Sequence, residues 1–139
     1  MIAIDTNVIV HYLVKSQDEH ARIRRWFSQT EEPLATTGTN IAEVFRLLTH
    51  PRVFPSPLSL ERAADLMHQF VEVCQIVILE ESTDWWKELK GLLSEVPSLR
   101  GNEIFDARIA ICLRYNGVRE FFTLDADFSK YKFLKIVRG

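Results

Sequence analysis

The chain has no long apolar run and few of the residues that build specialised sites. It holds two cysteines and five glycines in 139 residues, and no apolar stretch approaches the length that spans a bilayer. Cys74 and Cys112 lie in apolar surroundings, which predicts buried free thiols and fits a reducing cytoplasm. Because an apolar strand is expected to begin at Ile2, we expect no signal peptide and no membrane partner.

Several common catalytic patterns are also missing. The chain has no glycine-rich phosphate loop, so nucleotide hydrolysis of the P-loop type is not supported. Its four histidines lack the partners of a Ser/His/Asp triad or a Cys/His pair, and no His/Cys cluster would select zinc. His50 is the one histidine expected near a cleft, and we expect it at the surface.

The composition is that of one globular domain covering residues 1–139. Apolar residues make up 47% of the chain and charged residues 26%, and there is no repeat or linker. The net charge of −2 argues against a nucleic-acid partner, but two bound divalent ions would shift it to +2. Three clusters of basic residues could be ordinary solvated surface or could line a path for phosphates. They are Arg22, Arg24 and Arg25; Arg46, His50 and Arg52; and Lys130, Lys132, Lys135 and Arg138.

Short apolar runs alternate with stretches of helical periodicity. The strands are expected at 2–5, 34–36, 75–79, 121–124 and 133–137. The helices are expected at about 7–14, 16–29, 40–49, 59–72, 83–94 and 103–115, with a capping box at Ser16–Glu19 and with Ser59 and Asn102 as caps. This alternation predicts a three-layer α/β/α sandwich around a mostly parallel five-stranded sheet.

Acidic residues recur where such a fold reaches one edge of its sheet. Asp5 and Asp125 follow expected strands, and Glu43 and Asp106 lie early in expected helices. Ligands bind beyond the carboxyl ends of the strands in open α/β sheets, so these side chains are expected to converge there. Converging carboxylates cannot all remain ionised without a cation, and hard oxygen ligands suit Mg²⁺ or Mn²⁺. The sequence therefore predicts a divalent metal site and metal-assisted hydrolysis.

Each acidic residue also has a purely structural explanation. Asp5 is a possible N-cap, and Asp106 would be favoured by the helix dipole in a first turn, although its helical face is otherwise apolar. Asn40 and Glu43 have the spacing of a capping box, which would make Glu43 structural. Asp125 and Asp127 follow a strand end and could be turn residues. In the functional explanation, the nearby Thr123 would orient Asp125 or a bound water. The metal hypothesis depends on the whole set.

These motifs, in this order, resemble those of PIN domains. The similar segments are Asp5-Thr6-Asn7, Glu43, Phe105-Asp106-Ala107 and Thr123-x-Asp125-x-Asp127-Phe128, and they cover nearly the whole chain. The compact length and the stretch 49–54 are similar to the VapC-type ribonuclease toxins of toxin–antitoxin pairs.

The resemblance implies an endoribonuclease that uses Mg²⁺ or Mn²⁺, acts in the cytoplasm, forms a homodimer and pairs with a VapB-type antitoxin. It implies Asp5, Glu43, Asp106 and Asp125 as the core carboxylates, with Asp5, Asp106 and Asp125 on the metal. Thr6, Asn7, Thr123 and Asp127 would be auxiliary, and Arg46 and Arg108 are candidates for RNA contacts.

Two other functions remain open at this point. One is a catalytically silent PIN-like module that binds RNA or a protein. The other is a phospho-acceptor signalling domain, which would need an acidic pair after the first strand, an aspartate after the third and a lysine after the last. The third strand is instead followed by Glu80 and Glu81, and Arg138 rather than a lysine closes the chain.

Overall fold

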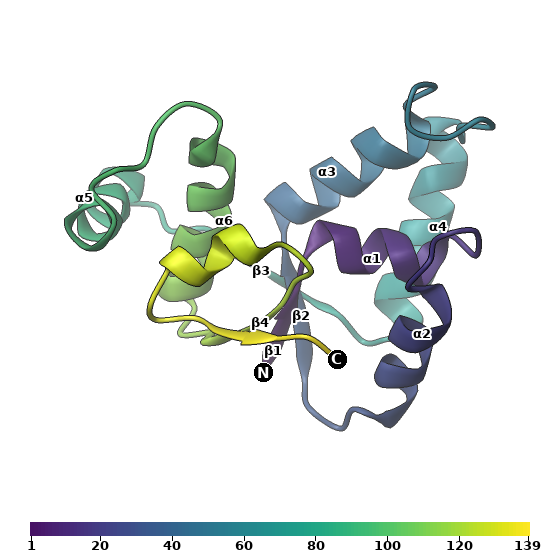
Figure 1. Ribbon diagram of the computed structural model, residues 1–139, viewed down its shortest axis with the longest axis horizontal. Helices are drawn as coiled ribbons and strands as arrows, with labels where there is room; N and C mark the ends of the chain where they lie inside the picture. Colours follow the sequence, from purple (N-terminus) through teal and green to yellow (C-terminus); the bar gives the residue numbers. More distant parts are fainter.

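A computed structural model describes all 139 residues, Met1–Gly139. Five strands and six helices alternate along the chain, with one 3-10 helix near the end (Figure 1). In chain order they are β1 (Ile2–Ile4), α1 (Thr6–Leu13), α2 (His20–Gln29), β2 (Leu34–Thr37), α3 (Gly38–Thr49), α4 (Leu60–Val73), β3 (Val77–Leu79), α5 (Trp85–Glu95), α6 (Glu103–Tyr115), β4 (Glu120–Phe122), η1 (Ala126–Lys130) and β5 (Lys135–Val137).

The five strands form one sheet in the order β3-β2-β1-β4-β5, and every neighbouring pair is parallel. The central strand β1 is buried along its whole length, as expected for a strand covered by helices on both faces. The chain leaves β1 toward β2 on one side and later returns to β4 on the other. Such a switch point opens a crevice beyond the carboxyl ends of the strands, which is where Asp5 follows β1.

Two apolar cores lie on opposite faces of the sheet. Successive side chains of a strand point to opposite faces, so Ile2 and Ile4 join one core and Ala3 joins the other. The core that contains Ile2 and Ile4 packs against α1–α4, and the core that contains Ala3 packs against α5 and α6. Figure 1 shows these helices on the two sides of the sheet. The three-layer α/β/α sandwich predicted from the sequence is confirmed.

Several local predictions were wrong at helix starts. The helix expected from Ser16 begins at His20, and Glu19 makes no capping bond because its carboxylate pairs with Arg22. Ser59 caps α4 as expected, but the Asn102 side chain makes no capping bond to α6. The 3-10 helix η1 was not predicted, because its sequence follows a strand end and has the composition of a turn.

Both cysteines are free thiols, and Cys112 is buried as expected, whereas Cys74 is only half-buried. None of the helices combines the length and the apolar character that crossing a membrane requires.

Candidate active site

Asp5 lies at the centre of a buried polar cluster beyond the end of β1. It is only 4% exposed, and its carboxylate accepts hydrogen bonds from the Thr6 backbone N–H (2.8 Å), the Asn40 amide (2.9 Å) and the Thr123 hydroxyl (2.5 Å). Burial raises the pKa of Asp5 to about 6, and the nearby charges of other acidic residues push it in the same direction. Asp5 is also the N-cap of α1, so its structural explanation is confirmed, and its role at a metal site stays a prediction.

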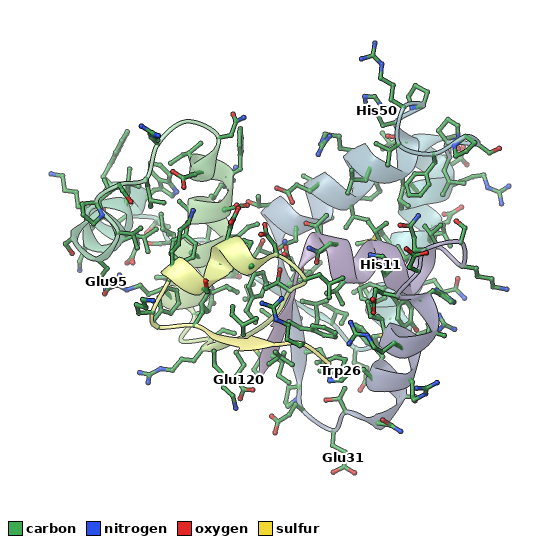
Figure 2. All side chains as sticks on the ribbon, in the orientation of Figure 1. His11, Trp26, Glu31, His50, Glu95 and Glu120 are labelled. Carbon is green, nitrogen blue, oxygen red and sulfur yellow. The ribbon has the colours of Figure 1, made fainter.

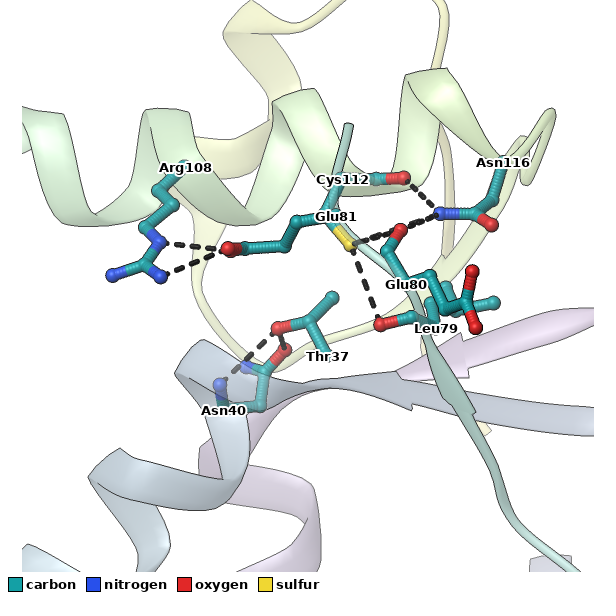
Figure 3. Close-up of polar contacts among 8 residues, drawn as sticks. All are labelled: Thr37, Asn40, Leu79, Glu80, Glu81, Arg108, Cys112 and Asn116. Carbon is teal, nitrogen blue, oxygen red and sulfur yellow. Dashed lines mark hydrogen bonds and ion pairs between the residues drawn. The ribbon is translucent and has the colours of Figure 1, made fainter. Parts of the chain in front are cut away.

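Asn40 is a member of this cluster that the sequence indicated only as a helix cap. Its side chain is fully buried, and its amide donates to Asp5 and also to the Thr6 hydroxyl (3.0 Å). Its amide oxygen accepts from the Thr37 hydroxyl (2.7 Å; Figure 3). The available signal was its position three residues before Glu43, which places both on one helical face.

Glu43 does not form the predicted capping box. The N-cap of α3 is Thr37, whose hydroxyl accepts from the Asn40 backbone N–H (3.2 Å), so Asn40 lies inside the helix. The Glu43 carboxylate instead accepts from the Thr6 hydroxyl (2.7 Å), at the start of α1. The capping explanation for Glu43 is therefore removed, and its side chain reaches the cluster around Asp5.

Asp106 lies in the first turn of α6, on the other wall of the crevice. Burial raises its pKa to about 6, with further contributions from the charges of Asp125 and Glu43. Lys130 acts in the opposite direction, but its ammonium group is already paired with Glu103 (2.8 Å). Acidic residues from distant segments thus help to raise the pKa of Asp5 and of Asp106, and Lys130 opposes this only at Asp106.

The segment after β4 completes the cluster. The Thr123 hydroxyl, which donates to Asp5, also accepts from the Asp125 backbone N–H (3.0 Å). Asp125 is the N-cap of η1, where its carboxylate accepts from the Asp127 backbone N–H (2.9 Å), and Asp127 itself is exposed. Asn7 accepts from the Leu124 backbone N–H at 3.4 Å, which joins α1 to this segment. Thr123 therefore orients Asp5 and positions the backbone at Asp125.

The candidate ligands suit a hard cation that keeps some of its waters, rather than an ion enclosed entirely by protein atoms. All the candidate ligands are oxygens, and no three His, Cys, Asp or Glu side chains converge closely enough to hold an ion by themselves. Mg²⁺ usually keeps several waters and binds one or two carboxylates directly, which a spread set of acids can provide. Direct ligation by Asp5, Asp106 and Asp125 together stays a prediction.

A groove of about 680 Å³ runs between α3 and α6. Glu43 lines one wall and Asp106 the other, and Arg46, Phe105 and Arg108 also line it. Both arginines expected near the substrate therefore lie in one groove with two of the acidic residues.

The two arginines differ in whether their guanidinium groups are paired with a carboxylate. Arg108 is held by Glu81 in a bidentate pair at 2.8 and 2.9 Å (Figure 3). Arg46 is exposed and belongs to no ion pair. His50 lies just past the C-terminal end of α3, at the opposite end of that helix from Gly38 (Figure 2). It does not line the groove.

The sequence matches a known family along most of its length. The family described as "PIN domain" matches residues 2–134. A curated relative, Ribonuclease VapC24 of Mycobacterium tuberculosis, is 26% identical over 142 aligned positions, which cover 98% of this chain and 94% of that protein.

Solved structures share the fold at lower sequence identity. The crystal structure of VapC20 from M. tuberculosis, described as a sarcin–ricin loop cleaving toxin, has a TM-score of 0.68 at 15% identity and covers 93% of each chain. The crystal structure of VapBC2 from Rickettsia felis, bound to a promoter DNA fragment, also has a TM-score of 0.68, at 18% identity, with 99% of this chain and 98% of that chain covered.

Proposed function

The chain belongs to the PIN-domain family, and we propose that it is an Mg²⁺- or Mn²⁺-dependent endoribonuclease acting as the toxin of a VapBC toxin–antitoxin pair. The observation that carries this proposal is that hydrogen bonds through Thr6 and Thr123 join Asp5 to Glu43 and to the backbone at Asp125, and that Glu43 and Asp106 line one groove. The ribonuclease names of the relatives support the reaction class.

In this proposal Asp5, Glu43, Asp106 and Asp125 are the catalytic carboxylates, and Asp5, Asp106 and Asp125 hold the metal. When bound, a divalent ion makes a water more acidic and neutralises charge on the phosphodiester. The chain's own contribution is orientation: Asp5 is held by three hydrogen bonds, and the Thr6 hydroxyl holds Glu43. Such pre-set geometry lowers the reorganisation needed during reaction.

The auxiliary residues act through these carboxylates. Thr6 and Thr123 donate to Glu43 and Asp5, whereas Asn7 holds the backbone after β4. The carboxylate of Asp127 is exposed and would contact water or the metal ion from the edge of the site. Arg46 and Arg108 would contact RNA phosphates, although Arg108 must then share its guanidinium with Glu81.

The protein partners follow from the same proposal. VapBC2 is a toxin–antitoxin complex, and we infer a VapB-type antitoxin, a homodimer and a cytoplasmic location, where RNA is available. Exposed apolar side chains at the edge strand β3, Val77 and Ile78, support a further protein contact. Sedimentation of the purified chain, alone and with its antitoxin, measures the assembly.

The other two functions are less well supported. A phospho-acceptor site needs a free aspartate after β3, but that position holds Glu80 and Glu81, and Glu81 is paired with Arg108. A silent PIN-like module would not need the retained carboxylates or the hydrogen bonds that orient them.

A cleavage assay tests the proposal. Purified protein is incubated with total RNA in Mg²⁺, in Mn²⁺ and in EDTA, and the new ends are sequenced. We expect defined cuts with 5′-phosphate and 3′-hydroxyl ends in either metal and none in EDTA. Uncut RNA under all conditions would leave the silent module as the better explanation.

A further inference from the structure

Phe105 is an aromatic side chain that the structure leaves uncovered in the groove beside Asp106. It is 56% exposed, although it is large and apolar and directly precedes a proposed catalytic residue. The opposite wall carries Arg46, three residues after Glu43 and therefore near it on the same helical face. The groove thus combines an open aromatic ring, a free guanidinium and two carboxylates.

An exposed aromatic ring beside a free guanidinium is typical of sites that bind single-stranded nucleic acid. Proteins that bind single strands stack bases on exposed aromatic rings and contact the backbone with basic side chains. A duplex hides the faces of its bases, so a stacking ring selects unpaired nucleotides. Arg46 is the available cation, because Arg108 is paired with Glu81.

We propose that Phe105 stacks on an RNA base next to the cleaved phosphodiester while Arg46 binds a neighbouring phosphate. The inference rests on the proposed ribonuclease function and deepens it, because it assigns Phe105 as a residue that recognises a base of the substrate. An RNA strand suits the groove, because the unpaired guanidinium of Arg46 matches a phosphate and the divalent ion of the proposed function would offset the charges of Glu43 and Asp106.

The chain offers matched control residues. Tyr115 is 50% exposed at the other end of α6 and does not line the groove, so Tyr115→Ala removes a similar aromatic elsewhere. Arg25 is exposed on α2, belongs to no ion pair and is outside the groove, so it is the control for Arg46. Phe105→Leu keeps an apolar side chain without a ring, whereas Phe105→Tyr keeps the ring.

The experiment measures binding separately from cleavage. All variants are made in an Asp125→Asn background, so that RNA survives, and binding of a short oligoadenylate is measured in Mg²⁺ against a duplex of the same length. We expect the single strand to bind more tightly than the duplex. Loss of the ring in Phe105→Leu and Phe105→Ala should weaken single-strand binding by about 5- to 160-fold, the range for loss of one stacked base. Phe105→Tyr and Tyr115→Ala should bind as the background does.

The salt dependence tests Arg46. Arg46→Gln should reduce the slope of log affinity against log salt by about 0.7, the value for one phosphate contact on a single strand, and Arg25→Gln should not change it. Melting temperatures confirm that each variant is folded.

The outcomes separate this inference from the proposed function. Equal binding by Phe105→Leu and the background, or no preference for the single strand, would overturn the stacking role even if the wild-type chain cuts RNA. Loss of antitoxin affinity in Phe105→Leu with unchanged RNA binding would assign the groove to the protein partner instead. A wild-type chain that cuts no RNA would count against the ribonuclease function, whatever the binding results show.

Discussion

The buried amide of Asn40 donates a hydrogen bond of 2.9 Å to the carboxylate of Asp5, linking the start of α3 to the end of β1. The same amide donates to Thr6, whose hydroxyl holds Glu43. One side chain therefore connects two of the proposed catalytic carboxylates. A tightly connected polar group of this kind is costly to disturb, because its partners are also shielded from water.

Replacing Asn40 by alanine should lower the free energy of unfolding by about 1 to 3 kcal/mol, because it leaves buried partners unsatisfied. Urea unfolding at neutral pH measures the change. Asn102→Ala is the control: that side chain is exposed and makes no capping bond, so its effect should stay within about 0.5 kcal/mol. Equal effects of the two substitutions would contradict the role given to Asn40.

Asp106→Asn should stabilise the metal-free protein at high pH. The pKa of Asp106 is raised by burial from 3.8 to about 6, so the folded chain holds the proton more tightly than the unfolded chain between these values. Wild-type stability therefore falls as pH rises through this window, and the full penalty is present above it. Asparagine has no such penalty.

Melting curves in EDTA from pH 4 to pH 8 check this expectation. The melting temperature of Asp106→Asn should exceed that of the wild type most at pH 8. This difference in melting temperature should become smaller as the pH falls toward 4. A constant difference for Asp106→Asn would mean that the carboxyl is not perturbed.

Glu43→Gln should retain the stability of the wild type and lose most cleavage. Glutamine can still accept from Thr6, so the fold keeps its hydrogen bond. An uncharged amide is, however, a poor ligand or orienting group for a hard cation. Glu61→Gln in the first turn of α4 is the matched control and should cleave normally. Full activity of Glu43→Gln would remove Glu43 from the catalytic set.

Millimolar Mn²⁺ or Mg²⁺ should raise the melting temperature, since an ion that binds only the folded state stabilises it by about RT ln(1 + [L]/Kd). The rise should disappear in Asp106→Asn plus Asp125→Asn. Asparagine at 125 can still accept from the Asp127 backbone N–H, so this cap of η1 survives. An equal rise in both proteins would place the ion elsewhere.

The sheet and the acidic edge were predictable from the sequence because they depend on short buried runs that end in polar residues. Ile2 to Ile4 followed by Asp5 is such a run, and parallel pairing brings its end beside those of β2 and β4. The family resemblance correctly indicated the fold.

The polar contacts within the site were less predictable. Thr37 and Asn40 are both good caps three residues apart, and local pattern cannot decide which one ends the strand and starts the helix. The strand pairing of Thr37 with Leu79 extends β2 to that point and moves the cap to Thr37. Asn40 then becomes a buried donor to Asp5, 35 positions away, and no local pattern contains that contact.

The burial of Cys112, unlike these polar contacts, was predictable from the sequence. Cys112 was expected to be buried from its apolar neighbours alone, and burial raises the pKa of its thiol to about 11. Burial follows from helix periodicity, whereas a specific partner depends on tertiary structure.

The most direct test of the proposed active site compares RNA cleavage in Mg²⁺ by the wild-type chain and by Asp106→Asn, with melting curves to show that both proteins are folded. We expect defined, EDTA-sensitive cuts by the wild type and a loss of most cleavage in the variant, because an uncharged amide is a poor ligand for a hard cation. Metal-dependent cleavage by Asp106→Asn at the wild-type rate would contradict the central claim that this acidic crevice is the active site.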